Sequence, residues 1–200
     1  MLIKSLVFLK HLVELLYFKI IPPKEFIFNG KNYRYFYALY NATWTAERKI
    51  EIPIFEDIVK SSSGEILEVG NVLNHYFPFN HEVIDKYEIA KGVINVDVID
   101  FKPKRKYDLI VSISTIEHVG FDEKNKDKDK PEKAILHLLG LLKTKGKLII
   151  SYPVGYNPGL DATIENPPFK IKRKWIIPIR AEGLTKRPVK NISIVEIAKK

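Results

Sequence analysis

Five short apolar runs, each ending near polar or acidic residues, constrain the fold of this chain more than any other feature. They occupy residues 65–70, 82–85, 92–97, 107–114 and 146–153. Runs of this length without polar alternation are typical of parallel strands that are buried on both faces of a sheet. In doubly wound sheets, ligands bind outside the carboxyl ends of the strands. The sequence therefore predicts an α/β protein with a doubly wound, mostly parallel sheet and a site along one edge.

The first run ends in a tight glycine turn just after an acid, in the segment Glu68-Val-Gly70. This is where a doubly wound sheet holds the sugar end of a nucleotide-like cofactor. A glycine at a strand end also serves simply to permit positive φ or close packing, so this second interpretation stays open.

The connections between the first three strands are short. Residues 71–82 contain Pro78, and residues 86–92 are fewer than the dozen or so that a parallel crossover needs. We therefore expect truncated helices in the early crossovers.

These segments resemble the successive motifs of the class I S-adenosylmethionine-dependent methyltransferases. The matching motifs are Glu68-Val-Gly70, Asp85, Asp97, the run YDLIVSISTIEHV at residues 107–119, and residues 142–153. The first motif departs from the family pattern, because Val72 and Asn74 stand where the family usually has glycine. The resemblance implies a Rossmann-like fold with a terminal antiparallel strand pair at residues 175–179 and 192–197. It also implies S-adenosylmethionine as cofactor and a methyl transfer reaction.

The resemblance further implies roles for individual residues. The implied cofactor-binding residues are Glu68, Gly70, Asn71, Asp85, Asp97, Val98 and Ser114. Asp85 would accept hydrogen bonds from the ribose hydroxyls, and Asp97 with the Val98 backbone would face the adenine. Glu68 and Asp97 could instead be ordinary strand-end carboxylates that bind nearby backbone N–H groups, and Asp85 could only cap a turn.

Methyl transfer is an in-line displacement, for which an enzyme mainly brings the two reactants together in the right orientation. It needs a base only where the acceptor still holds its proton at the working pH. His118 is suited to that role near neutral pH, and Tyr156 lies in the loop 152–161, where an acceptor would enter. Alternatively, Glu117 and His118 only order their loop.

Composition removes several other classes of protein. With no cysteine, disulfides and cysteine metal sites are excluded, and the five histidines show no zinc spacing, so we expect no metal. No Gly-x-Gly-x-x-Gly follows the first strand, which disfavours a redox enzyme. Abundant Lys, Glu and Ile with a single Met would suit a thermophile.

Positive charge is concentrated near the end of the chain. Of the net charge of +9, residues 170–200 contribute ten Lys or Arg against two Glu. Such a segment suits nucleic acid, an anionic lipid surface or a phosphorylated substrate, or it merely solubilises an edge strand.

From the resemblance, we expect a methyltransferase acting on a small-molecule or glycan-type acceptor. The alternative is a non-catalytic binding module with a degenerate cofactor site, which uses its basic segment for nucleic acid, anionic lipid or a protein partner.

Residues 1–63 are expected to form a separate segment ahead of a Rossmann domain at 64–200. Residues 1–21 are predicted to form an amphipathic helix with an apolar stripe of Leu2, Leu6, Leu9, Val13, Leu16 and Ile20. Its charges argue against a membrane span or a secretory signal. The helix either packs on the domain or a partner, or lies in a membrane surface. We expect a cytoplasmic protein, with peripheral membrane attachment through this helix as an open alternative.

The remaining elements follow from turn and cap signals. Asn29-Gly30 between aromatic runs predicts a hairpin, and Pro53 is expected to open a helix ending near Lys60. Residues 120–130 are interpreted as a solvated loop, and Pro131 is expected to open an apolar-faced helix that ends at residues 143–146.

Overall fold

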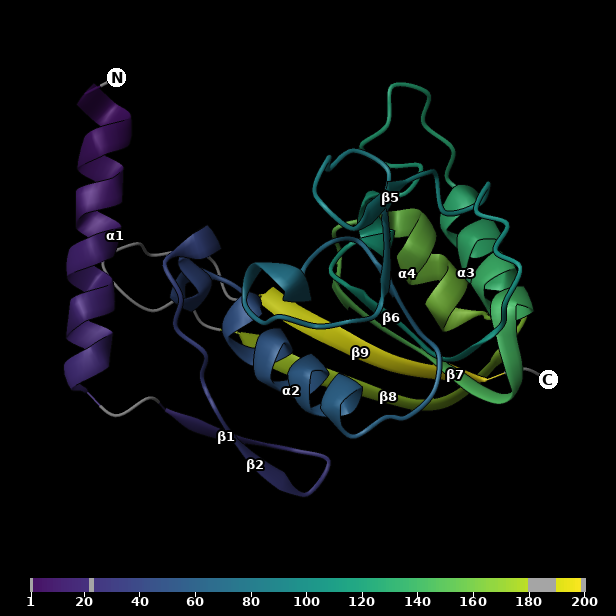
Figure 1. Cartoon of the computed structure of the whole chain (residues 1–200), viewed down its shortest axis with the longest axis horizontal. Helices are drawn as coiled ribbons and strands as arrows, with labels where there is room; N and C mark the ends of the chain where they lie inside the picture. The colour runs from purple at the N-terminus through teal and green to yellow at the C-terminus, as the bar shows by residue number, and fades with distance from the viewer. Residues whose placement is uncertain (1, 22–23, 180–189, 199–200) are drawn as a thin grey trace. The chain divides into compact units, whose positions relative to one another are not determined.

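The computed structural model describes residues 2–21, 24–179 and 190–198 (Figure 1). The chain forms two compact units, one of Met1–Ile58 with Pro178–Lys190 and the other of Val59–Ile177 with Asn191–Lys200. The domain boundary that the sequence suggests at residue 63 stays a prediction.

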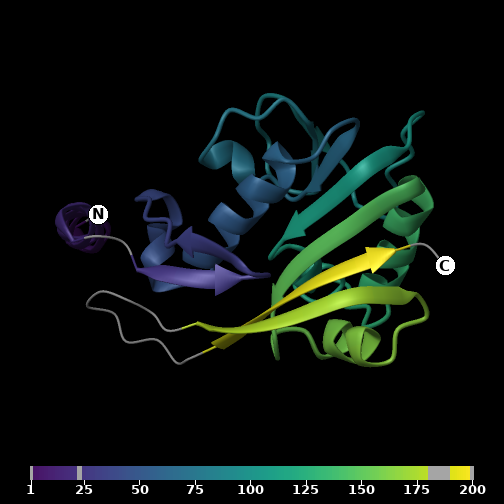
Figure 2. The same cartoon turned by 90° about the horizontal axis from the view of Figure 1, so that it is seen from below.

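The second unit is built on a seven-stranded sheet, whose twist is visible in Figure 2. Its strands are β3 (Ile66–Val69), β4 (Glu82–Asp85), β5 (Val93–Asn95), β6 (Tyr107–Ile113), β7 (Leu142–Pro153), β8 (Lys170–Ile179) and β9 (Lys190–Ala198). Their order is β5-β4-β3-β6-β7-β9-β8. The pairs among β3 to β7 are parallel, and β9 runs antiparallel to β7. The predicted doubly wound, mostly parallel sheet is confirmed, and its strand order reverses between β3 and β6.

Two helices complete the core of this unit. Helices α3 (Lys130–Leu141) and α4 (Pro158–Glu165) lie side by side (Figure 1). Their buried side chains pack with those of the central strands, among them Ala134, Leu138, Leu160, Ile110, Leu148 and Val195. The predicted apolar face of the helix after residue 130 is therefore confirmed.

The early crossovers are as short as the sequence indicates. Only a 3-10 turn, η2 (Leu73–His75), lies between β3 and β4, and residues 86–92 between β4 and β5 contain no helix.

Two predicted boundaries near β7 are wrong. Helix α3 ends at Leu141, and β7 begins at once at Leu142 instead of after a glycine cap. Leu142 pairs with Tyr107 and Lys147 with Leu109, so residues 143–146 form an irregularity within the strand ladder. The last residues of the loop expected at 152–161 instead begin α4, which Asn157 caps by accepting the N–H of Gly159 at 2.9 Å.

The first unit contains the predicted hairpin, with β1 (Glu25–Phe28) antiparallel to β2 (Lys31–Arg34). Asn29 and Gly30 both have positive φ, as the turn requires. Helix α2 (Arg48–Lys60) begins five residues before the predicted start, with Pro53 inside it. Proline cannot donate to the carbonyl four residues earlier. That carbonyl, on Lys49, instead accepts the N–H of Phe36 at 2.9 Å, so the helix continues past the proline.

Helix α1 (Leu2–Ile20) packs through a different face from its apolar stripe. The indole N–H of the fully buried Trp44, in η1 (Tyr40–Thr45), donates to Glu14 at 3.0 Å. The rings of His11 and Phe18 also contact Trp44. The stripe residues Leu6, Leu9, Val13, Leu16 and Ile20 are exposed. Among the described residues, no helix is long and apolar enough to span a membrane.

Candidate functional site

The carboxyl ends of β3, β4, β5 and β6 carry most of the residues implied by the family resemblance. Glu68 and Gly70 belong to the end of β3, Asp85 is the last residue of β4, and Ser114 follows β6. Because adjacent parallel strands end at one edge of a sheet, these groups lie along a single edge next to the reversal of strand order.

Glu68 braces the turn after β3. Its side chain is fully buried, and its Oε1 accepts the N–H groups of Val72 at 2.9 Å and Leu73 at 2.8 Å. Its Oε2 lies 2.6 Å from Nε2 of His81. These contacts match the alternative in which Glu68 binds backbone N–H groups.

Gly70 sits in the left-handed region at φ +88°, and its N–H donates to the Ile84 carbonyl at 2.8 Å. A Cβ at this position would lie 2.2 Å from Oγ1 of Thr115. The close approach of the segment after β6 therefore requires glycine here, for sterics as well as for φ.

Asp85 is engaged by backbone donors. Its Oδ2 accepts the N–H of Asn71 at 3.2 Å, and its Oδ1 accepts the N–H groups of Tyr87 and Glu88, both at 2.8 Å. A carboxylate offers about four lone-pair sites. One site therefore remains for a further donor. The side chain of Asn71 donates to Glu88 at 2.7 Å.

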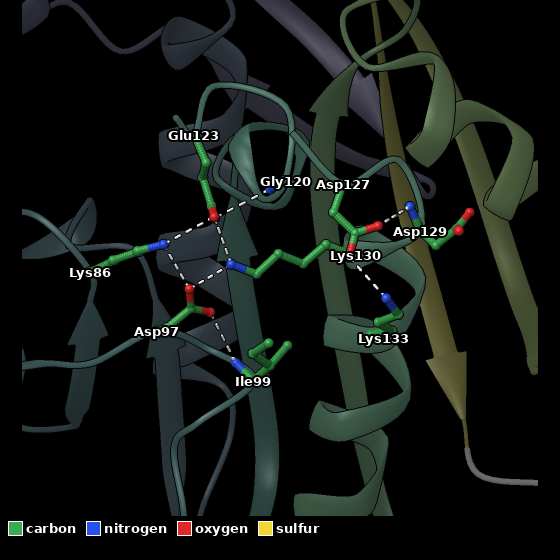
Figure 3. A network of polar contacts seen from close by, with 9 residues as sticks. All are labelled: Lys86, Asp97, Ile99, Gly120, Glu123, Asp127, Asp129, Lys130 and Lys133. Atoms are coloured by element: carbon green, nitrogen blue, oxygen red, sulfur yellow. Dashed lines mark hydrogen bonds and ion pairs between the residues drawn. The ribbon is translucent and has the colours of Figure 1, made fainter. Parts of the chain in front are cut away.

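Asp97 belongs to an ionic network of four side chains, shown in Figure 3. Its Oδ2 accepts from Nζ of Lys130 at 2.6 Å and lies 2.8 Å from Nζ of Lys86. Glu123 bridges the same two lysines, at 2.7 Å from Lys130 and 3.1 Å from Lys86. The cluster, called the four-residue network below, joins the ends of β4 and β5 to the loop before α3.

The charges of the four-residue network are matched. Burial raises the pKa of Asp97, but the hydrogen bonds from Lys130 and Lys86 outweigh burial and hold that pKa below its usual value. Glu123 shows the same balance and a lowered pKa. Burial lowers the pKa of Lys86, yet its bonds to the two carboxylates raise it overall. The Asp97 and Glu123 carboxylates and the Lys86 ammonium therefore stay charged at neutral pH.

The loop at 120–130 is more ordered than the sequence indicates. Glu123 also accepts the N–H of Gly120 at 3.3 Å, and Asp127 pairs with Lys133 at 2.8 Å (Figure 3). Glu123 and Asp127 thus close the loop on itself and on α3, while most other charged side chains of the loop are exposed, as predicted.

Val98 and Ser114 are both buried. Ser114 has a φ of +38°, unusual for a residue other than glycine, and its N–H donates to the Ser151 carbonyl at 3.0 Å. The backbone after β6 is thus fixed in its direction by β7.

His118 and Tyr156 are brought together, although 38 residues separate them. Their rings lie edge to face with centroids 5.0 Å apart, and the Tyr156 hydroxyl is 3.3 Å from Nδ1 of His118. Asp122 joins them, because its Oδ2 bonds to Nδ1 of His118 and accepts the Tyr156 hydroxyl at 2.7 Å. His118 closes the turn η3 (Ile116–His118), and Tyr156 precedes α4. We call these three residues the His-Asp-Tyr cluster.

Contacts within the His-Asp-Tyr cluster shift the pKa values of Asp122 and Tyr156. Hydrogen bonds from His118 and then Tyr156 lower the pKa of Asp122. Burial, followed by the bond to Asp122, raises the pKa of Tyr156 to about 12. A carboxylate at Nδ1 favours the tautomer with its proton there, which leaves Nε2 as an acceptor. Sequence reasoning missed Asp122, and its spacing of four residues from His118 was the available signal.

No family model matches the sequence, and no curated protein matches it. Solved structures do resemble the fold. TehB from Haemophilus influenzae is 10% identical with a TM-score of 0.51, and the match covers 77% of this chain and 64% of TehB. A TehB-like SAM-dependent methyltransferase from Corynebacterium glutamicum is 16% identical with a TM-score of 0.48, over 74% of this chain and 86% of that one.

The N-methyltransferase NodS from Bradyrhizobium japonicum, solved with S-adenosyl-L-homocysteine, is 12% identical with a TM-score of 0.48. That match covers 70% of this chain and 81% of NodS. Together with the strand order, the TehB likeness shows that the chain has a Rossmann-like α/β fold.

Proposed function

We propose that the chain is an S-adenosylmethionine-dependent methyltransferase that acts on a small-molecule or glycan-type acceptor. The observation that carries the proposal is the sheet edge, where the Gly70 turn and Asp85 stand beside the reversal of strand order. Ligands of doubly wound folds bind at this reversal. The nearby His-Asp-Tyr cluster supplies groups for handling the acceptor.

The residues at the ribose position fit a nucleoside cofactor, with one refinement. Asp85 has a single remaining acceptor site after its three backbone bonds, so it would hold one ribose hydroxyl rather than two. Glu68 would act indirectly, by bracing the turn that bears Gly70 and Asn71. Ser114 would lie beside the methionine end.

The residues at the adenine position fit less well. The Asp97 carboxylate is engaged by Lys86, Lys130 and the Ile99 N–H, so adenine contacts would come from the Val98 backbone. Asp97 is then a positioning residue for its loop.

S-adenosylmethionine would supply an activated methyl group, and the chain's residues would orient the acceptor and take its proton. Nε2 of His118 would accept that proton, because Asp122 fixes Nδ1–H and stabilises the charged ring. Tyr156 stays protonated at neutral pH and donates to Asp122, which holds the carboxylate in place.

The binding test is calorimetric titration with S-adenosylmethionine and S-adenosylhomocysteine. We expect saturable binding of both. No heat at about 1 mM ligand, the upper end of usual substrate affinities, would contradict the proposal.

The role of His118 is tested separately by His118→Gln. We expect methyl transfer to fall about 100-fold or more, since general-base catalysis contributes about 10²–10⁴, while S-adenosylhomocysteine affinity stays unchanged. Release of S-adenosylhomocysteine is followed with pooled small-molecule and saccharide acceptors. Tyr156→Phe should also reduce the rate, and Tyr17→Phe, at an exposed tyrosine in α1, is its matched control. Undiminished turnover in His118→Gln would remove the histidine from the reaction.

A further inference from the structure

The surface around His118 combines aromatic rings with negative charge. The rings of Phe121 and Tyr156 lie with their centroids 5.6 Å apart. The Asp122 side chain is 45% exposed, and its carboxylate joins His118 to Tyr156 at this surface. Aromatic faces and carboxylates both attract cations. The His-Asp-Tyr cluster together with Phe121 therefore has the composition of an ammonium-binding surface.

An ammonium group of the chain already lies against this surface. Nζ of Lys126 is 5.1 Å from the centroid of the Phe121 ring. The pKa of Asp122, which is lowered mainly by the bonds from His118 and Tyr156, is lowered further by the charge of Lys126. The side chain of Lys126 is exposed, and it is itself a primary amine. The ring and the carboxylate thus both act on one amine.

The imidazole of His118 stands between two carboxylates. Asp122 bonds to its Nδ1, and Oε1 of Glu117 lies 3.8 Å from its Nε2. The Glu117 side chain is only 1% exposed. Acceptors that react as anions, such as phenolates and carboxylates, are repelled by these charges. An ammonium ion becomes neutral when it loses its proton, so it meets no such repulsion.

The strength of an imidazole base separates amines from alcohols. An ordinary imidazole has a pKa of about 6.5, and an α-amino group has one of about 7.7–8.0. Water has a pKa of about 15.7, and aliphatic hydroxyl groups are acids of similar weakness. Proton transfer is efficient when the acid and the base are close in strength. An imidazole therefore deprotonates an ammonium ion far more readily than a sugar hydroxyl.

We propose that the acceptor atom is an amine nitrogen, and that the substrate binds as an ammonium ion to the Asp122 carboxylate and the rings of Phe121 and Tyr156. The proposal rests on the proposed methyl transfer and narrows its acceptor class. Nε2 of His118 takes one ammonium proton, which leaves a lone pair on nitrogen. That pair forms the bond to the methyl carbon while the carbon–sulfur bond breaks, and the electrons of the broken bond go to sulfur. Positive charge moves to nitrogen, where Asp122 stabilises it.

The first test measures binding without turnover. The full chain is titrated with two pairs of probes that differ in one group, glucosamine against glucose and benzylamine against benzyl alcohol. Each probe is taken to about 50 mM, which saturates a millimolar site, and NMR shifts of the His118, Phe121 and Tyr156 rings report binding. At neutral pH we expect each amine to bind about tenfold more tightly than its hydroxyl partner, the usual effect of a charge-assisted hydrogen bond.

Two variants assign this preference to the surface. Asp122→Asn keeps the shape of the side chain and removes its charge, so amine affinity should fall about tenfold while benzyl alcohol affinity stays unchanged. Lys126→Met removes the competing ammonium group and should raise amine affinity about twofold to fivefold, the usual size of an exposed cation–π contact. Lys124→Met, at another exposed lysine of the same loop, is its control and should have no effect.

A second test separates this proposal from the methyl transfer itself. The pooled acceptors are assayed for release of S-adenosylhomocysteine before and after acetylation of their amines. Acetylation should abolish the release. Undiminished release would keep the methyl transfer and overturn the amine acceptor, whereas failure of S-adenosylhomocysteine to bind in calorimetry would contradict the methyl transfer alone. Amines that bind no more tightly than their hydroxyl partners, or that bind Asp122→Asn as tightly as the parent chain, would also overturn the amine proposal.

Discussion

Gly70 shows how one residue can serve local geometry and packing together. Its positive φ is a backbone conformation that L side chains rarely adopt, and the Thr115 side chain fills the space where a Cβ would lie. The glycine predicted from the sequence as part of a cofactor turn thus also permits the segment after β6 to approach β3.

We expect Gly70→Ala to destabilise the chain more than Gly92→Ala. Gly92 has a similar φ of +83° with open space around its Cβ position, so its substitution costs only the conformational strain of about 1–2 kcal/mol. Gly70→Ala should add about 1–3 kcal/mol from overpacking against Thr115. Urea unfolding of both variants measures the difference.

A further variant separates the two causes. In Gly70→Ala/Thr115→Ala the nearest contacts, Oγ1 and Cγ2 of Thr115, are gone, so part of the added loss should be recovered. No recovery would show that contact with Oγ1 and Cγ2 of Thr115 does not cause the added loss.

At the scale of elements, α1 shows that an apolar stripe need not be the packed face. The stripe residues from Leu6 to Ile20 are exposed, and the side chain of Leu2 lies outside the described part. The helix is held to η1 through His11, Glu14 and Phe18 around Trp44. Whether this stripe packs on the domain or a partner, or contacts a membrane surface, stays a prediction.

We expect Glu14→Ala to loosen α1, because it leaves the buried indole N–H of Trp44 without its acceptor. A lost buried hydrogen bond of this kind costs about 1–3 kcal/mol. Hydrogen exchange of the α1 amides should become faster. Leu9→Ala, at a residue 56% exposed on the same helix, is the control and should leave exchange unchanged. Equal exchange in the two variants would argue against the Trp44 anchor.

At the scale of the whole molecule, the four-residue network ties together segments far apart in the chain. Lys130 lies 33 residues from Asp97, and its side chain is only 10% exposed between two carboxylates. Removing one partner of a buried ion pair leaves charge uncompensated and typically costs about 3–5 kcal/mol.

We expect Lys130→Met to lower the free energy of unfolding by about 3 kcal/mol at pH 7. Lys128→Met, at an exposed lysine two residues away, should have almost no effect. Urea unfolding at matched ionic strength tests both. A loss in Lys130→Met no larger than in Lys128→Met would show that the network does not stabilise the fold.

The same network makes stability depend on acid pH. Asp97 and Glu123 have pKa values lowered in the folded chain, so their contribution is present above their unfolded pKa values, near 4. It is lost as pH falls from there through the folded values. The gap in unfolding free energy between the parent chain and Lys130→Met should therefore be full at pH 7 and shrink below about pH 4. A gap that stays constant with pH would contradict this origin.

Much of the fold follows from local patterns. The apolar runs predict the five parallel strands, because a strand buried on both faces is a run of apolar residues without polar alternation. Asn29-Gly30 predicts the hairpin turn for a steric reason. Predicted helix boundaries are wrong where a contact with a residue distant in sequence determines them. One example is Lys49, whose carbonyl accepts the N–H of Phe36, so that α2 continues through Pro53.

The sequence by itself determined the sheet, the shortened crossovers and the edge where polar groups gather. The reason is that a buried strand and the length of a connection are both visible within a short stretch of sequence. Only the tertiary structure decided what those polar groups do. Asp97 is engaged by Lys130, and Asp122 joins His118 to Tyr156, through contacts between segments 33 and 34 residues apart. Hydrogen-bond partners of this kind depend on how the chain closes around its core, and no local spacing encodes that closure.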